Sequence, residues 1–125
     1  MHYKVSGSGT PIVLIHGFCE NSSIWKDLEK ELSDDYQIIS VDLPGFGQSP
    51  LDNSDLTSDH VATMLYDFLK HLKISNCFMI GHSLGGYTIM SFVEKYSDML
   101  LVFGLFHSTT FADSEEKKAI REKGI

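Results

Sequence analysis

The segment NCFMIGHSLGG, residues 76–86, joins an apolar, strand-like run directly to the start of a helix. Gly81 and Gly85 each lie two residues from Ser83, at positions where side chains would collide with neighbouring backbone. The turn lifts the Ser83 hydroxyl clear of the strand and aims it where the helix N-terminus and backbone N–H groups stabilise negative charge. The segment therefore predicts a nucleophilic serine on a sharp strand-to-helix turn. A turn with an incidental serine is the alternative interpretation.

The rest of the chain alternates strand-like apolar runs with segments of helical periodicity, a pattern typical of parallel strands with crossover helices. Strands are predicted at residues 2–6, 11–15, 36–41, 76–80 and 100–106. Helices are predicted at residues 24–32, 61–72, 84–96 and 113–123. All but the short first strand are apolar on both faces, as expected for strands that helices cover on both sides. The predicted fold class is α/β, a mostly parallel sheet with helices on both faces, in one domain.

His16, Gly17 and Phe18 follow the first long strand, where the loops of a parallel sheet gather around its ligand crevice. Acyl transfer needs two backbone N–H donors for the developing oxyanion, one from the residue after the nucleophile and one from this loop. We assign these donors to the main chain of Leu84 and Phe18. His16 has two interpretations: a buried histidine that ties loops together, which we prefer, and a general base.

Residues 42–49, DLPGFGQS, follow the next strand, and their proline and two glycines predict a tight turn. Asp42 at the strand end has two interpretations. It holds this turn by accepting backbone hydrogen bonds, which we prefer, or it orients a catalytic histidine.

Composition excludes several partners. Ten Lys and Arg against seventeen Asp and Glu give a net charge of −7, which repels phosphate backbones and anionic lipid. We therefore expect no nucleic-acid partner and no membrane binding. The first residues lack the profile of a secretory signal, so a cytoplasmic protein is expected. Cys19 and Cys77 are expected to be free thiols, with a disulfide as the alternative.

Taken together, the strand ends carrying His16-Gly17-Phe18, residues 42–49 and residues 81–86 resemble the N-terminal half of the α/β-hydrolase superfamily. The resemblance covers the whole chain. It implies a core at residues 1–111 and the start of a cap helix at residues 112–125. Members acting on epoxides or haloalkanes carry aspartate where this chain has Ser83, so the resemblance implies acyl transfer on a small ester, thioester or amide. It implies no metal and no organic cofactor, with Gly17, Gly81, His82 and Gly85 as structural residues near the site.

The chain departs from that family in its catalytic acid and base. Members supply them after the serine, in the order acid and then histidine. Asp113 is a candidate acid, but no histidine follows it. The other histidines are expected to have surface or structural roles: His60, His71, His82 and His107. Without a positioned base the serine hydroxyl stays protonated, so little activity is expected from this chain alone.

These observations leave three hypotheses. The first is a serine hydrolase represented by its N-terminal half, which lacks its acid and histidine. The second is a non-catalytic half-fold whose exposed last strand, residues 100–106, pairs in a homodimer, with residues 113–125 packing on the partner. The third is a symmetric dimer in which His107 or His60 of one copy reaches Ser83 of the other.

Overall fold

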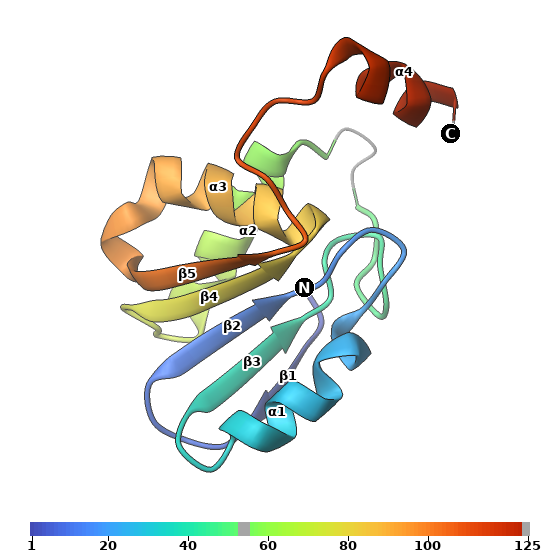
Figure 1. Ribbon diagram of the computed structural model, residues 1–125. Coiled ribbons are helices and arrows are strands. Elements are labelled where there is room, and N and C mark those ends of the chain that lie inside the picture. Colours follow the sequence, from blue (N-terminus) through green and yellow to red (C-terminus); the bar gives the residue numbers. More distant parts are fainter. Residues whose placement is uncertain (53–55, 124–125) are drawn as a thin grey trace.

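The computed structural model describes residues 1–52 and 56–123, which form one five-stranded sheet in the order β1-β3-β2-β4-β5 (Figure 1). The strands are β1 (Tyr3–Ser6), β2 (Pro11–Ile15), β3 (Gln37–Val41), β4 (Cys77–His82) and β5 (Leu100–Phe106). The helices are α1 (Lys26–Leu32), α2 (Ser58–His71), α3 (Leu84–Tyr96) and α4 (Glu115–Lys123), with short 3-10 turns at Ser22–Trp25 and Ser97–Met99.

The sheet is mostly parallel, as predicted. β2 lies at its centre and pairs in parallel with β3 and β4, β4 pairs in parallel with β5, and β1 runs antiparallel to β3. The carboxyl ends of β2, β3, β4 and β5 therefore meet at one edge. The three segments that carry the predicted site all begin at this edge.

Helices cover both faces of the sheet, which confirms the predicted fold class. α1 lies on one face, and α2 and α3 lie on the other (Figure 1). Alternate residues of β2 divide between the faces: Ile12 and Leu14 pack with Trp25 near α1, whereas Val13 and Ile15 join the larger core beneath α2 and α3. This alternation holds the ends of the central strands rigid between two apolar layers.

Two strands differ slightly from the predictions in where they begin or end. The strand predicted from residue 36 begins at Gln37, because the N–H of Tyr36 still donates to the carbonyl oxygen of Leu32 at the end of α1. The strand predicted at residues 76–80 continues to His82, so β4 runs into the serine turn without a break. The side chain of Thr57 accepts from the N–H of His60 and caps the start of α2.

One side of the sheet has little cover. β5 is an edge strand, and Leu101, Val102 and Phe106 are exposed, with Val102 at 61%. This matches the expectation of an exposed apolar edge at residues 100–106. α4 lies beyond the carboxyl ends of the strands, away from the sheet (Figure 1). The assignment of residues 112–125 to a cap stays a prediction, and residues 124 and 125 lie outside the described part of the chain.

Both cysteines are free thiols, as expected: Cys19 is exposed and Cys77 is buried. Burial raises the pKa of the Cys77 thiol to about 12, so this thiol stays protonated and inert. No helix within residues 1–52 and 56–123 has the length and apolar character needed to cross a bilayer.

Candidate active site

Ser83 has the strained backbone that the sequence predicted. Its φ of 49° and ψ of −110° place a non-glycine residue in a conformation that L-residues rarely adopt. Two hydrogen bonds hold it there: the N–H of Ser83 donates to the carbonyl oxygen of Phe106 at 2.9 Å, and the N–H of Gly86 donates to the carbonyl oxygen of Ser83 at 3.0 Å. The end of β5 and the first turn of α3 therefore fix the serine between them.

The flanking glycines allow this turn because the backbone passes very close on both sides. A Cβ atom on Gly81 would lie 2.6 Å from the carbonyl oxygen of Gly85. A Cβ atom on Gly85 would overlap the carbonyl oxygen of Ile15 and lie 2.8 Å from that of His16. The start of α3 thus presses against the end of β2, which brings the predicted oxyanion loop beside the serine.

Gly17 is the point of contact between that loop and the serine turn. A Cβ atom on Gly17 would lie 3.2 Å from Cβ of Ser83 and 3.0 Å from Nδ1 of His82. Within residues 1–52 and 56–123, no acceptor takes the backbone N–H of Phe18 or of Leu84. Two unbonded donors thus lie on the two segments that meet at Ser83, an arrangement suited to binding an oxyanion.

Glu20 is a residue of the site that the sequence analysis missed. Its Oε2 atom accepts from the N–H of Gly17 at 2.6 Å and from Nδ1 of His82 at 2.8 Å. Burial raises the pKa of Glu20, but the hydrogen bonds from His82 and Gly17 outweigh it and leave the pKa below its usual value. The ionised carboxylate therefore ties the oxyanion loop to the residue before Ser83. An acid three residues after Gly17 was the only local signal for this contact.

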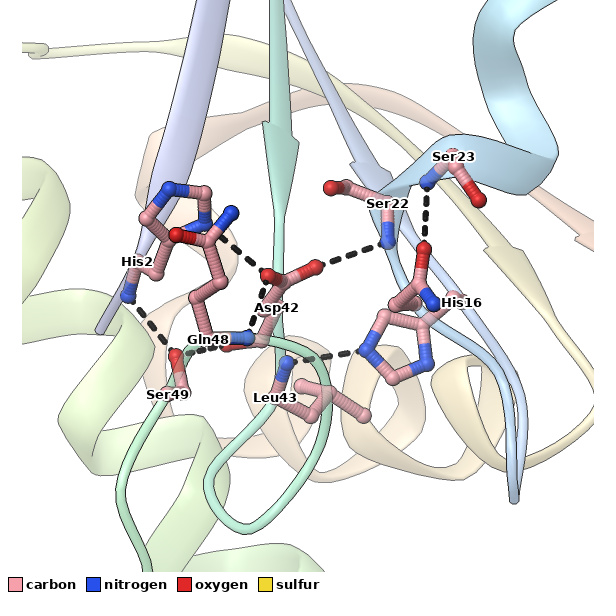
Figure 2. Close-up of polar contacts among 9 residues, drawn as sticks. His2, His16, Ser22, Ser23, Asp42, Leu43, Gln48 and Ser49 are labelled. Carbon is pink, nitrogen blue, oxygen red and sulfur yellow. Dashed lines mark hydrogen bonds and ion pairs between the residues drawn. The ribbon is translucent and has the colours of Figure 1, made fainter.

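His16 is used entirely in holding loops. Its Nε2 atom accepts from the N–H of Leu43 at 2.9 Å (Figure 2). Nδ1 therefore carries the proton and donates to the carbonyl oxygen of Gly17 at 2.7 Å. The ring is fully buried. With both nitrogens engaged, His16 has no atom left to act as a general base, which supports the structural interpretation.

Asp42 holds the turn after β3 (Figure 2). Its carboxylate accepts from the N–H of Ser22 at 2.7 Å, from the N–H of Gln48 at 2.9 Å and from Nδ1 of His2 at 2.9 Å. The hydroxyl of Ser49 donates to its carbonyl oxygen at 2.6 Å. Burial raises the pKa of the Asp42 carboxyl, but the hydrogen bonds from Gln48, Ser22 and His2 outweigh burial and lower this pKa to about 2. The bonds support the turn-holding interpretation.

Within residues 1–52 and 56–123, none of the remaining candidate acids and bases hydrogen-bonds to Ser83. The rings of His82 and His107 lie 5.6 Å apart, and His82 is bonded to Glu20. His60 and His71 lie at the two ends of α2. The Asp113 carboxylate pairs with Nε of Arg121 at 3.1 Å. Over residues 1–52 and 56–123, no side chain hydrogen-bonds to the Ser83 hydroxyl, and no three metal-ligating side chains gather to hold an ion.

Comparison with known proteins identifies the family. The family model of the alpha/beta hydrolase fold matches residues 10–113. The chain belongs to the α/β-hydrolase family, and the matched residues include the strained Ser83.

The relatives include both esterases and epoxide hydrolases. A solved thermophilic esterase from Thermogutta terrifontis is 32% identical in sequence and superposes with a TM-score of 0.92. The match covers 98% of this chain and 45% of the esterase chain. Epoxide hydrolase 3 of Xenopus tropicalis is 33% identical over 90% of this chain and 32% of its own length. The soluble epoxide hydrolase of Corynebacterium sp. (strain C12) is 32% identical over 85% of this chain and 36% of its own. The chain thus spans about a third of these curated relatives.

Proposed function

We propose that this chain provides the nucleophile and the oxyanion hole of a serine hydrolase that acts on carboxylic esters. The observation that carries the proposal is the strained backbone of Ser83 beside the two unbonded N–H groups of Phe18 and Leu84. A serine hydroxyl attacks carbonyl carbon and forms an acyl-enzyme, a reaction that fits an ester better than an epoxide. The esterase relative is consistent with this substrate class.

The chemistry divides between this chain and groups outside it. The Oγ atom of Ser83 bonds to the carbonyl carbon, and the carbonyl electron pair moves to the oxygen, which the two N–H groups stabilise. Collapse expels the alcohol, which takes the proton released by Ser83, and water then frees the acid. Proton transfer needs a base near Ser83, which the described residues do not supply. We infer that an acid and a histidine come from a further part of the protein or from a second copy.

Covalent labelling tests the proposed nucleophile. Intact mass spectrometry after incubation with a fluorophosphonate is expected to show one adduct per chain when a second copy or a further part of the protein supplies the base, and none in Ser83→Ala, because only an activated serine displaces fluoride from phosphorus. The matched control is Ser97→Ala, which removes an exposed serine at the far end of α3 and should label like the wild type. A folded wild-type protein that has this base and still takes no label would contradict Ser83 as the nucleophile.

A second candidate function is self-assembly through β5. The observation that favours it is the exposed apolar edge strand, with Leu101 at 47% and Val102 at 61% exposure. We propose a homodimer in which two copies of β5 pair across a twofold axis.

Light scattering during size-exclusion chromatography tests this assembly. The wild type is expected to elute as a dimer, and Val102→Lys as a monomer, because a lysine on each copy places like charge at the pairing edge. The control Val5→Lys carries the same change on β1 at the opposite edge and should stay dimeric. A folded, monomeric wild type rules the dimer out. If the dimer forms and labels, His107→Ala and His60→Ala test whether one copy completes the site of the other.

A further inference from the structure

A cavity of about 270 Å³ opens beside the serine turn. The oxyanion loop, the turn after β3, the start of α2 and the first turn of α3 form its walls. Its apolar lining comes from Phe18, Leu43, Phe46, Leu56, Val61 and Leu84, and the other lining residues are a proline, a serine and two threonines. Among residues 1–52 and 56–123, no side chain that lines it is charged or titrates near neutral pH.

The cavity adjoins the proposed oxyanion hole. Phe18 and Leu84, whose backbone N–H groups are the proposed donors, both line the cavity. The ring of Phe18 packs edge-on against Phe46, with 5.7 Å between the ring centroids, which joins the loop to the turn. An ester whose carbonyl oxygen is held by these two N–H groups therefore has its substituents beside this cavity.

Building on the proposed function, we propose that this cavity binds the acyl chain of the ester and that the substrates are uncharged, medium-chain acyl esters. The leaving alcohol has to face a group that can protonate it. Among residues 1–52 and 56–123, the only polar side chains that line the cavity are hydroxyls, so these residues offer no such group. The acyl substituent is therefore the part that enters. A carboxylate on that chain would be buried without a cationic partner, so dicarboxylic acyl groups are rejected.

Size sets the chain length. Pockets that enclose a whole drug-sized ligand measure roughly 300–1,000 Å³, so a cavity of about 270 Å³ accepts one substituent. A larger hollow of about 390 Å³ lies against β4 and β5 and is lined by Phe78, Ile80 and Val102. It includes neither Phe18 nor Leu84, so it does not open from the oxyanion hole and serves as an internal comparison.

Methyl NMR on the full 125-residue chain carrying Ser83→Ala tests the acyl pocket without requiring turnover. Methyl hexanoate is expected to shift the methyl signals of Val61, Leu43 and Leu84 and to leave those of Val102 in place. Its dissociation constant should be at least about tenfold lower than that of methyl acetate, because each buried methylene strengthens binding about threefold to fourfold. Monomethyl adipate, similar in length but charged, should bind no better than methyl acetate.

Paired variants separate the pocket from general effects. Val61→Phe fills the cavity and should remove the preference for hexanoate over acetate, whereas Val93→Phe makes the same change on α3 at a different depression and should keep it. Shifts confined to Val102, or equal binding of both esters by a folded wild-type site, would overturn the inference. Chain-length-dependent binding with no fluorophosphonate label would instead refute the proposed nucleophile alone, so the two failures are distinguishable.

Discussion

Gly85→Ala is expected to destabilise the protein by at least about 3 kcal/mol, because the new methyl group would overlap backbone rather than a movable side chain. The carbonyl oxygens of Ile15 and His16 belong to the central strand and its exit loop, which lie between two apolar layers and have little room to retreat. Relief requires α3 to move away from β2, which would also separate Ser83 from Gly17. Urea unfolding followed by circular dichroism measures the loss.

Gly104→Ala is the matched control for this substitution. Gly104 lies in β5, and a Cβ atom there would make ordinary contacts with Phe106 at 3.6 Å and Ile80 at 3.9 Å. Its unfolding free energy is expected to match or slightly exceed that of the wild type, since alanine restricts the unfolded chain more than glycine. If both variants lose the same stability, the close approach of α3 to β2 is not what requires a glycine.

Asp42→Asn is expected to cost about 3 kcal/mol at pH 7. Its carboxylate accepts three hydrogen bonds from groups on three separate segments, those of Ser22, Gln48 and His2. An amide presents N–H groups to some of these donors and leaves them buried without partners. The exposed Asp67 on α2 provides the control, and Asp67→Asn should change the unfolding free energy by less than about 0.5 kcal/mol.

The pH dependence of stability gives Asp42 a second signature. Its pKa is about 2 in the folded protein against an ordinary value of 3.8, so the unfolded chain binds the proton more readily. This contribution, about 2 kcal/mol, is fully present above pH 4 and is lost as the pH falls from about 4 to about 2. Wild type and Asp42→Asn should therefore converge in stability toward pH 2. Parallel curves across that range would contradict the low pKa.

The sequence predicted secondary structure well where an element depends only on residues close to it in the chain. The helix predicted at residues 61–72 is observed as Ser58–His71, capped by Thr57. The sharp turn at Ser83 was predicted from two glycines within two residues of it, and it is observed with a positive φ at Ser83. Each of these features depends on neighbours in sequence, so periodicity and turn chemistry were sufficient to find them.

Contacts between distant segments could not be predicted in the same way. Glu20 meets His82 across 62 residues, and His2 meets Asp42 across 40 residues. The first pair exists because parallel strands bring their loops to one edge of the sheet, and the second because the antiparallel strand β1 begins at that edge. Residue spacing alone does not say which side chains face each other there. His16 was predicted to be structural, but its partners Leu43 and Gly17 could be identified only from the structure.

The hydrogen bond from Ser83 to the carbonyl oxygen of Phe106 makes the reactive residue mechanically dependent on the outermost strand. β5 has a neighbour on one side only, so it can shift more readily than the strands at the centre. A segment that pairs with the open edge of β5 would restrict the motion of its end. Through the hydrogen bond to Phe106, it would also restrict the backbone of Ser83. The backbone conformation of the proposed nucleophile therefore depends on whether a further strand pairs with β5, and we expect it to be fixed most firmly when one does.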